Sequence, residues 1–139
     1  MKLNPDCIRD ILFTVEAECG FGKSFWFNPN TSDSKVWDEF EFLKNYSYDE
    51  VCYHLQQCDD TGYFSPRGRN KSLTLWLGGG FMVDDLSPKG HEFVNNIRED
   101  TNWKKTKEKA KSVGSFALNI LESIAATVIS TQINNMMGM

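Results

Sequence analysis

Residues 17–24, AECGFGKS, match the loose spacing of a phosphate-binding loop, in which Gly22, Lys23 and Ser24 follow a small residue and four others. In such a loop a strand enters the glycines and a helix leaves from the Lys-Ser pair, so that free helical N–H groups face the phosphates. Here the order is reversed, because an amphipathic pattern precedes the glycines and a short aromatic stretch follows Ser24. The sequence therefore predicts a helix end and then a strand, and no nucleotide site.

A second candidate for chemistry is the pair His54 and Cys58, whose spacing of four places them on one helix face, as half of a metal site. Two more ligands are needed, and Cys7, Cys19 and His91 are candidates that the sequence does not constrain. The alternative is that the thiols are buried as small apolar residues. Because no nucleophile–base spacing is present either, we expect no enzyme, no cofactor and no bound metal.

Charge is unevenly distributed along this chain of 139 residues, whose formal net charge is −4. Residues 33–60 hold eight acidic side chains against two lysines, whereas residues 101–111 hold five lysines and one glutamate. Opposite poles of this kind are either solvated faces or a field that orients a partner. The overall negative charge disfavours a general nucleic-acid binder.

Bulk composition indicates a folded protein with one domain and an appended helix. The hydrophobic content of 40% and the aromatic content of 13% argue against disorder. The first ten residues lack the apolar stretch of a signal peptide, and no apolar run approaches the ~18 residues of a membrane span. We therefore expect a cytoplasmic protein with no membrane partner, whose four cysteines stay reduced.

Capping residues mark the helix boundaries. Asn4-Pro5 begins one helix, for which Gly20 and Gly22 are the expected C-terminal cap. Ser47 with Glu50 forms a capping box for another helix, which Gly62 closes. Further elements are expected as follows: a short strand in 23–30, a short helix over 34–44, a β-hairpin over 71–86, a helix from Ser87-Pro88, and C-terminal helices over 101–111 and 116–136 with a break at Gly114-Ser115.

This order predicts an α+β, mostly α fold: a winged helix-turn-helix with a two-stranded β wing in residues 1–100. Residues 101–139 would form a C-terminal helical extension, in which a basic helix is followed by an apolar amphipathic helix.

Three blocks carry a family resemblance: MKLNPDCIRDIL, YSYDEVCYHLQQCDDTGYF and LSPKGHEFVNNIREDTNWKKTKEKAKSVGSFALNI. Together they resemble a widespread group of small phage and prophage proteins that is classed only as a domain of unknown function. The resemblance implies a winged-helix N-terminal domain, a bacterial or viral cytoplasm and no enzyme. The chain departs from the usual pattern in a longer aromatic segment between Gly20 and Tyr46 and in a Gly-rich hairpin.

The helix from Ser47 to Asp60 would occupy the recognition-helix position of a winged helix. It offers Tyr53, Gln56 and Gln57 beside four carboxylates and carries no lysine or arginine. Carboxylates repel a polyanion, so this composition favours contact with a protein over reading of a DNA groove.

The leading hypothesis is thus a protein–protein interaction module that engages a host or phage protein, with a homodimer formed through the last helix. The alternative to this homodimer is that the last helix packs across its own domain. The predicted interface residues are Tyr53, Gln56, Gln57, Trp26, Trp37, Ile120, Leu121, Ile124 and Val128.

The alternative function is a DNA-binding transcriptional regulator that uses the wing and the lysine-rich helix. Its phosphate-contacting residues would be Arg67, Arg69, Lys71, Lys104, Lys107 and Lys111. The lysines also fit an ordinary solvated helix that turns Trp103, Ala110 and Val113 towards the core.

Overall fold

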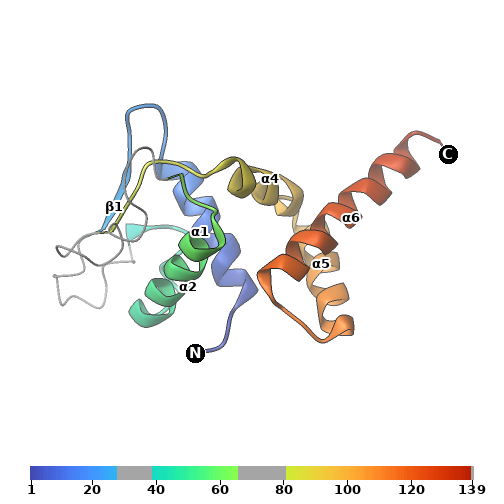
Figure 1. Ribbon diagram of the computed structural model, residues 1–139, viewed down its shortest axis with the longest axis horizontal. Coiled ribbons are helices and arrows are strands. Elements are labelled where there is room, and N and C mark those ends of the chain that lie inside the picture. Colours follow the sequence, from blue (N-terminus) through green and yellow to red (C-terminus); the bar gives the residue numbers. More distant parts are fainter. Residues whose placement is uncertain (28–38, 66–80, 139) are drawn as a thin grey trace.

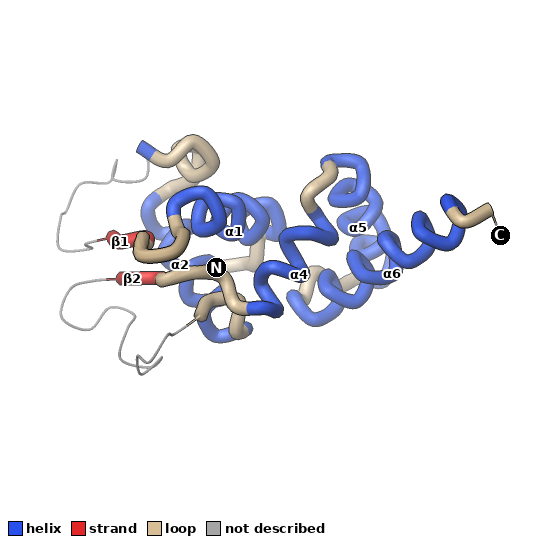
Figure 2. Tube along the Cα trace, turned by 90° about the horizontal axis from the view of Figure 1, so that it is seen from above, coloured by secondary structure: helices blue, strands red, loops and turns tan. Residues whose placement is uncertain are grey.

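The computed structural model describes residues 1–27, 39–65 and 81–138 (Figure 1). In these ranges the chain is mostly α-helical. Its elements are α1 (Pro5–Glu18), β1 (Phe25–Phe27), α2 (Tyr48–Thr61), β2 (Phe81–Val83), α4 (Pro88–Ile97), α5 (Asp100–Val113) and α6 (Leu118–Met136). Figure 2 shows the strands beside α1 and α2 at one end of the molecule, and α4, α5 and α6 towards the other end.

The expected start of α1 is confirmed. The Asn4 side chain accepts a hydrogen bond from the N–H of Asp6, and Pro5 occupies the first turn. The expected glycine cap is wrong, because α1 ends at Cys19 in an extended conformation. Gly22, with φ of 76°, instead lies in a tight turn between Gly20 and Lys23.

Both predicted ends of α2, the predicted start of α4 and the predicted break after α5 are also confirmed. Ser47 and Glu50 form a complete capping box, and Gly62 ends α2 in the left-handed conformation. The Ser87 side chain accepts from the N–H of Gly90 at the start of α4. Gly114, with φ of 86°, ends α5, so that α6 packs back against α5 and α4.

The predicted winged helix with a two-stranded β wing is wrong. β2, expected as the second strand of a hairpin, pairs antiparallel with β1, which precedes α2, in the register Phe25↔Val83, Trp26↔Met82 and Phe27↔Phe81. A three-residue ladder between segments separated by residues 28–80 is not a wing. Local turn residues favoured a hairpin, but the folded helices bring the aromatic segment after α1 beside β2. Residues 66–80 lie outside the described part of the chain.

Of the short helix expected over 34–44, only residues 39–44 are described: Glu39 has 3-10 helical geometry, and no α-helix continues from it in this portion. Residues 40–46 form turns, closed by hydrogen bonds from the Lys44 N–H to the Phe40 carbonyl and from the Tyr46 N–H to the Leu43 carbonyl. Leu43 is buried, so this segment still contributes to the core. Residues 34–38 lie outside the described ranges.

The core is one continuous cluster. The inner faces of the helices form it: Cys7, Ile8, Ile11, Leu12, Val15, Val51, Leu55, Cys58, Phe93, Val94, Ile97, Ala110, Leu121 and Ala125. Tyr63, directly after α2, is fully buried, and its ring stacks on Phe93 at a centroid distance of 5.4 Å.

The start of α4 lies against the backbone that follows α2. The N–H of Ser87 donates to the carbonyl of Tyr63, and a Cβ added to Gly90 would lie 2.3 Å from that oxygen. Only glycine fits this approach without a shift of the backbone. None of the helices in the described ranges is long and apolar enough to cross a membrane.

Candidate interaction surfaces

His54 is a structural residue that joins two helices. It is buried; its Nε2 accepts from the backbone N–H of Asn4 at 2.8 Å, while Nδ1 lies 2.6 Å from the carbonyl oxygen of Glu50. The neutral ring protonated at Nδ1 satisfies both contacts. Burial lowers the pKa of His54, which favours this neutral form. With both ring nitrogens engaged, His54 has no lone pair left for a metal.

The four cysteines are free thiols. Burial, reinforced by nearby carboxylates, raises the pKa of Cys7 to about 12, and burial raises the pKa of Cys58 well above its ordinary value. Both are therefore protonated near neutral pH and are poor nucleophiles. No group of three or more histidine, cysteine or acidic side chains able to hold a metal occurs in the described residues.

The segment that matches a phosphate-loop pattern is a turn between α1 and β1. Gly20 and Lys23 exchange two backbone hydrogen bonds of 3.0 Å across it. The Ser24 hydroxyl donates to Asp84 at 2.9 Å, and strand β1, not a helix, begins at the next residue. The geometry therefore lacks the helical N–H groups that a phosphate loop requires.

The outer side of α2 presents a polar stripe. Asp49, Tyr53, Gln56 and Asp60 recur at i, i+4, i+7 and i+11, so they lie along one line of the helix, opposite the buried residues; we call them the outer stripe of α2. Asp49, Gln56 and Asp60 are exposed and Tyr53 is half-buried, while Gln57 lies beside the stripe and is also half-buried.

On α5 the predicted lysines are divided between two roles. The Lys107 ammonium pairs with the Asp6 carboxylate at 2.9 Å and lies 5.6 Å from the centre of the Trp103 ring. Partial burial opposes ionisation of Asp6, but hydrogen bonds from Lys107 and Trp103 outweigh it and lower the pKa of Asp6. Lys107 thus fastens α5 to α1. The other four lysines of α5, Lys104, Lys105, Lys109 and Lys111, are exposed and have no side-chain partner among the described residues.

The predicted α6 interface is largely occupied by the chain itself. Leu121 and Val128 are buried, and Leu121 belongs to the common core. Ile120 and Ile124 are half-buried, and Ile124 packs against the same core. This is the arrangement of the alternative in which the helix lies across its own domain.

The remaining predicted residues cannot be placed as side chains. Arg67, Arg69, Lys71 and Trp37 lie outside the described residues. Trp26 lies in β1, opposite Met82.

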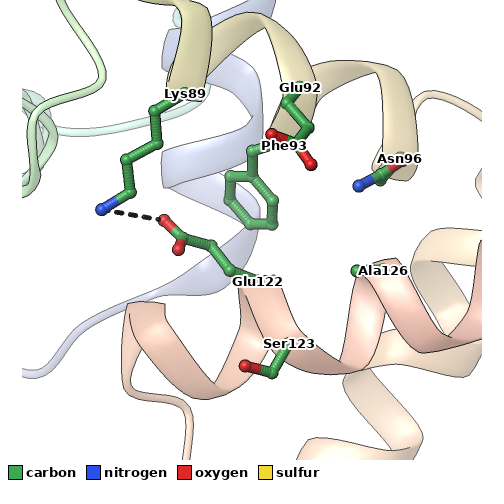
Figure 3. Close-up of a pocket in the computed structure, with 7 residues that line it drawn as sticks. All are labelled: Lys89, Glu92, Phe93, Asn96, Glu122, Ser123 and Ala126. Atoms are coloured by element: carbon green, nitrogen blue, oxygen red, sulfur yellow. Dashed lines mark ion pairs between the residues drawn. The ribbon is translucent and has the colours of Figure 1, made fainter.

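A groove between α4 and α6 was missed by sequence reasoning. It has a volume of about 250 Å³ and is lined by Lys89, Glu92, Phe93, Asn96, Glu122, Ser123 and Ala126 (Figure 3). At one side of it the Tyr63 hydroxyl donates to Glu122 at 2.5 Å, and the Lys89 ammonium lies 3.6 Å from the same carboxylate. These charged groups are paired with one another. Nothing in the local spacing signals the groove, because it joins two helices.

A second cluster that the sequence did not predict holds the α4–α5 junction. Arg9 donates to the carbonyls of Ile97 and Arg98 at 3.0 and 2.8 Å and pairs with Asp100 at 2.9 Å. The guanidinium also lies 4.7 Å from the centre of the Phe13 ring. Its donors complete the end of α4, so the cluster is structural.

Together these features define a small, mostly helical protein whose charged outer faces are its main candidates for function. The sequence profile of the family described as hypothetical protein (DUF2513) matches residues 2–117, so the chain belongs to this family. An uncharacterized protein of Haemophilus influenzae is similar, with 27% identity over 132 residues that cover 94% of this chain and 97% of that protein. No solved structure matches the chain. The resemblance to a family of unknown function is thus confirmed, whereas a phage origin has no support in these comparisons.

Proposed function

We propose that the protein is a non-enzymatic module that binds a protein of a bacterial host or of a phage through the outer stripe of α2. One observation carries this proposal: a rigid helix, fixed in the core along its inner face, presents four polar side chains to solvent and carries no lysine or arginine. Its only histidine is buried in the neutral form. The stripe is therefore a surface of negative charge, and its two carboxylates and the Gln56 amide are exposed to solvent.

The chemistry of the stripe indicates the kind of partner. Asp49 and Asp60 stand at its two ends, with Tyr53 and Gln56 between them. A tyrosine supplies contact area at low entropic cost, and carboxylates at the rim favour and orient a basic surface. The expected partner thus offers lysines or arginines around a pocket for the Tyr53 ring.

The test uses the tagged full chain to recover partners from a lysate of its native bacterial host, with quantitative mass spectrometry. The variant Asp49→Lys/Tyr53→Ala/Asp60→Lys removes the charge and the ring of the stripe. Because the Tyr53 ring also lies edge-on to the buried His54 ring at a centroid distance of 5.0 Å, thermal unfolding checks that the variant is folded. The control is Lys104→Glu/Lys111→Glu on α5. We expect the stripe variant to lose at least ten-fold of the specifically recovered protein and the control to retain it. Equal recovery by both variants would reject the proposal.

A second candidate function is phosphate binding by α5, favoured by its four exposed lysines without partners among the described residues. If all four neutralise phosphates of a duplex, the logarithm of the binding constant should fall with the logarithm of salt with a slope of about −3 to −4. Titration of a random duplex at about 50 mM salt tests this candidate. Binding that Lys104→Glu/Lys111→Glu abolishes would favour it over the protein partner, and no binding at this salt would remove it.

A further inference from the structure

The end of α6 extends past the body of the protein. In Figures 1 and 2 its last turns project beyond the ends of α4 and α5. Exposure follows the same division: Leu121 and Ala125 are fully buried, whereas Ile133 is 51% and Met136 is 86% exposed. Towards this end, the Gln132 amide donates to the side chain of Asn102.

The projecting end carries an apolar line of its own. Ile129, Ile133 and Met136 recur at i, i+4 and i+7, and we call them the tip stripe. The helical spacing places Ala126, which lines the groove between α4 and α6, on the same side as this stripe. The groove therefore lies next to the tip stripe, in which Ile129 is half-buried and Ile133 and Met136 are exposed. Aligned apolar side chains that form a contiguous exposed patch mark a contact surface, whereas single ones do not.

The charge pattern indicates which partner fits. The chain has 34 charged side chains, 15 basic and 19 acidic, yet none lies between residues 123 and 139. Two copies of an acidic chain repel each other wherever charged faces meet, and an uncharged segment avoids this cost. The polar residues beside the stripe are hydroxyls and amides, which both donate and accept and can therefore pair with their own copies. A lipid surface fits less well, because no basic side chain flanks the stripe.

We infer that the tip stripe binds the tip stripe of a second copy, with the two α6 helices antiparallel across a two-fold axis near Ile133. An isologous contact places Ile133 opposite its own copy and Ile129 opposite Met136 of the partner copy. Antiparallel helices also oppose their dipoles favourably. The contact is small, so the dimer is transient, with a dissociation constant of about 10 to 100 μM. This surface is separate from the outer stripe of α2, and either proposal can fail without the other.

Sedimentation velocity of the full chain from about 1 μM to about 500 μM tests the inference. The wild type should pass from monomer to dimer, and Ile133→Asp should stay monomeric at every concentration. The matched control is Thr127→Asp, which adds the same charge to an exposed position on the other side of α6. It should dimerise as the wild type does.

A cross-link tests the position of the axis. Ile133→Cys should form an inter-chain disulfide under mild oxidation at least ten times faster than Thr127→Cys. Three results would overturn the inference: a wild type that stays monomeric at about 500 μM, a dimer that Ile133→Asp leaves intact, or a monomer that cosediments with phosphatidylcholine vesicles through the tip stripe.

Discussion

Helices α2 and α5 are alike in construction and opposite in charge. Each has fourteen residues, and each ends at a glycine in the left-handed conformation, Gly62 with φ of 89° and Gly114 with φ of 86°. Their inner faces enter the same core, through Val51 and Leu55 on one and Trp103 and Ala110 on the other. Their outer faces differ, because α2 carries acidic and amide side chains and no lysine or arginine, whereas α5 carries lysines.

The two helices also differ in how firmly their ends are held. α2 begins with a complete capping box and is followed by Tyr63, which is packed against α4. The N-cap residue of α5 is Glu99, whose side chain makes no cap hydrogen bond. The last residue of α5, Val113, is exposed, as is Phe116 in the turn that follows. The inner faces of both helices thus pack into the core, while most of the charged side chains on their outer faces are exposed.

The largest expected effect concerns the junctions that follow the two helices. Gly90→Ala places a methyl group 2.3 Å from the Tyr63 carbonyl oxygen, so the backbone must shift, and we expect a loss of about 3 kcal/mol in the free energy of unfolding. Gly114→Ala meets no atom within 4 Å but keeps φ of 86°, which costs about 1 kcal/mol. Denaturant unfolding measures both. Equal losses would mean that the α2–α4 junction is no tighter than the α5–α6 turn.

The second effect is a pH dependence between pH 7 and 5 that comes from His54 on α2; α5 holds no histidine. Because burial lowers the pKa of His54, the unfolded chain takes up its proton first as pH falls below about 6.5. Stability due to His54 is therefore complete above this pH and is lost as pH falls through the folded pKa. We expect His54→Gln to lower stability by about 2 kcal/mol at pH 8 and to flatten the slope between pH 7 and 5.

Unfolding curves across this pH range, measured for both proteins, check the prediction. An unchanged slope in the variant would show that another group is responsible.

The smallest effect concerns the two N-terminal caps. Ser47→Ala removes the acceptor for the Glu50 N–H and should cost about 1 kcal/mol. Glu99→Ser supplies α5 with the cap that it lacks and should add about 0.5 kcal/mol. Thermal unfolding distinguishes the two shifts by sign. A gain of stability in both variants would contradict the assignment of the caps.

What the sequence could predict was local. Asn4-Pro5, Ser47 with Glu50, Gly62, Ser87-Pro88 and Gly114 mark helix ends through bonds within a few residues, so they were found correctly. The pairing of β1 with β2 was missed because the hydrogen-bond partner of a short strand depends on where the helices bring it.

The same reason explains the missed contacts. Three hydrogen bonds join residues that are far apart in the sequence. His54 accepts from the N–H of Asn4, Arg9 donates to the carbonyl of Ile97, and Tyr63 donates to the carboxylate of Glu122. Of the candidate site, the absence of cations from α2 could be read directly from its residues. The regular alignment of its outer stripe became evident only once the buried face was known.

Carboxyl footprinting of the complex recovered with the full chain tests the central claim most directly. Carbodiimide labelling of Asp49 and Asp60 should fall at least five-fold on binding, because the outer stripe of α2 becomes covered. Labelling of Glu108 on α5 should stay unchanged. Protection of Glu108 with Asp49 and Asp60 still reactive would contradict the claim, since the partner would then bind the lysine face.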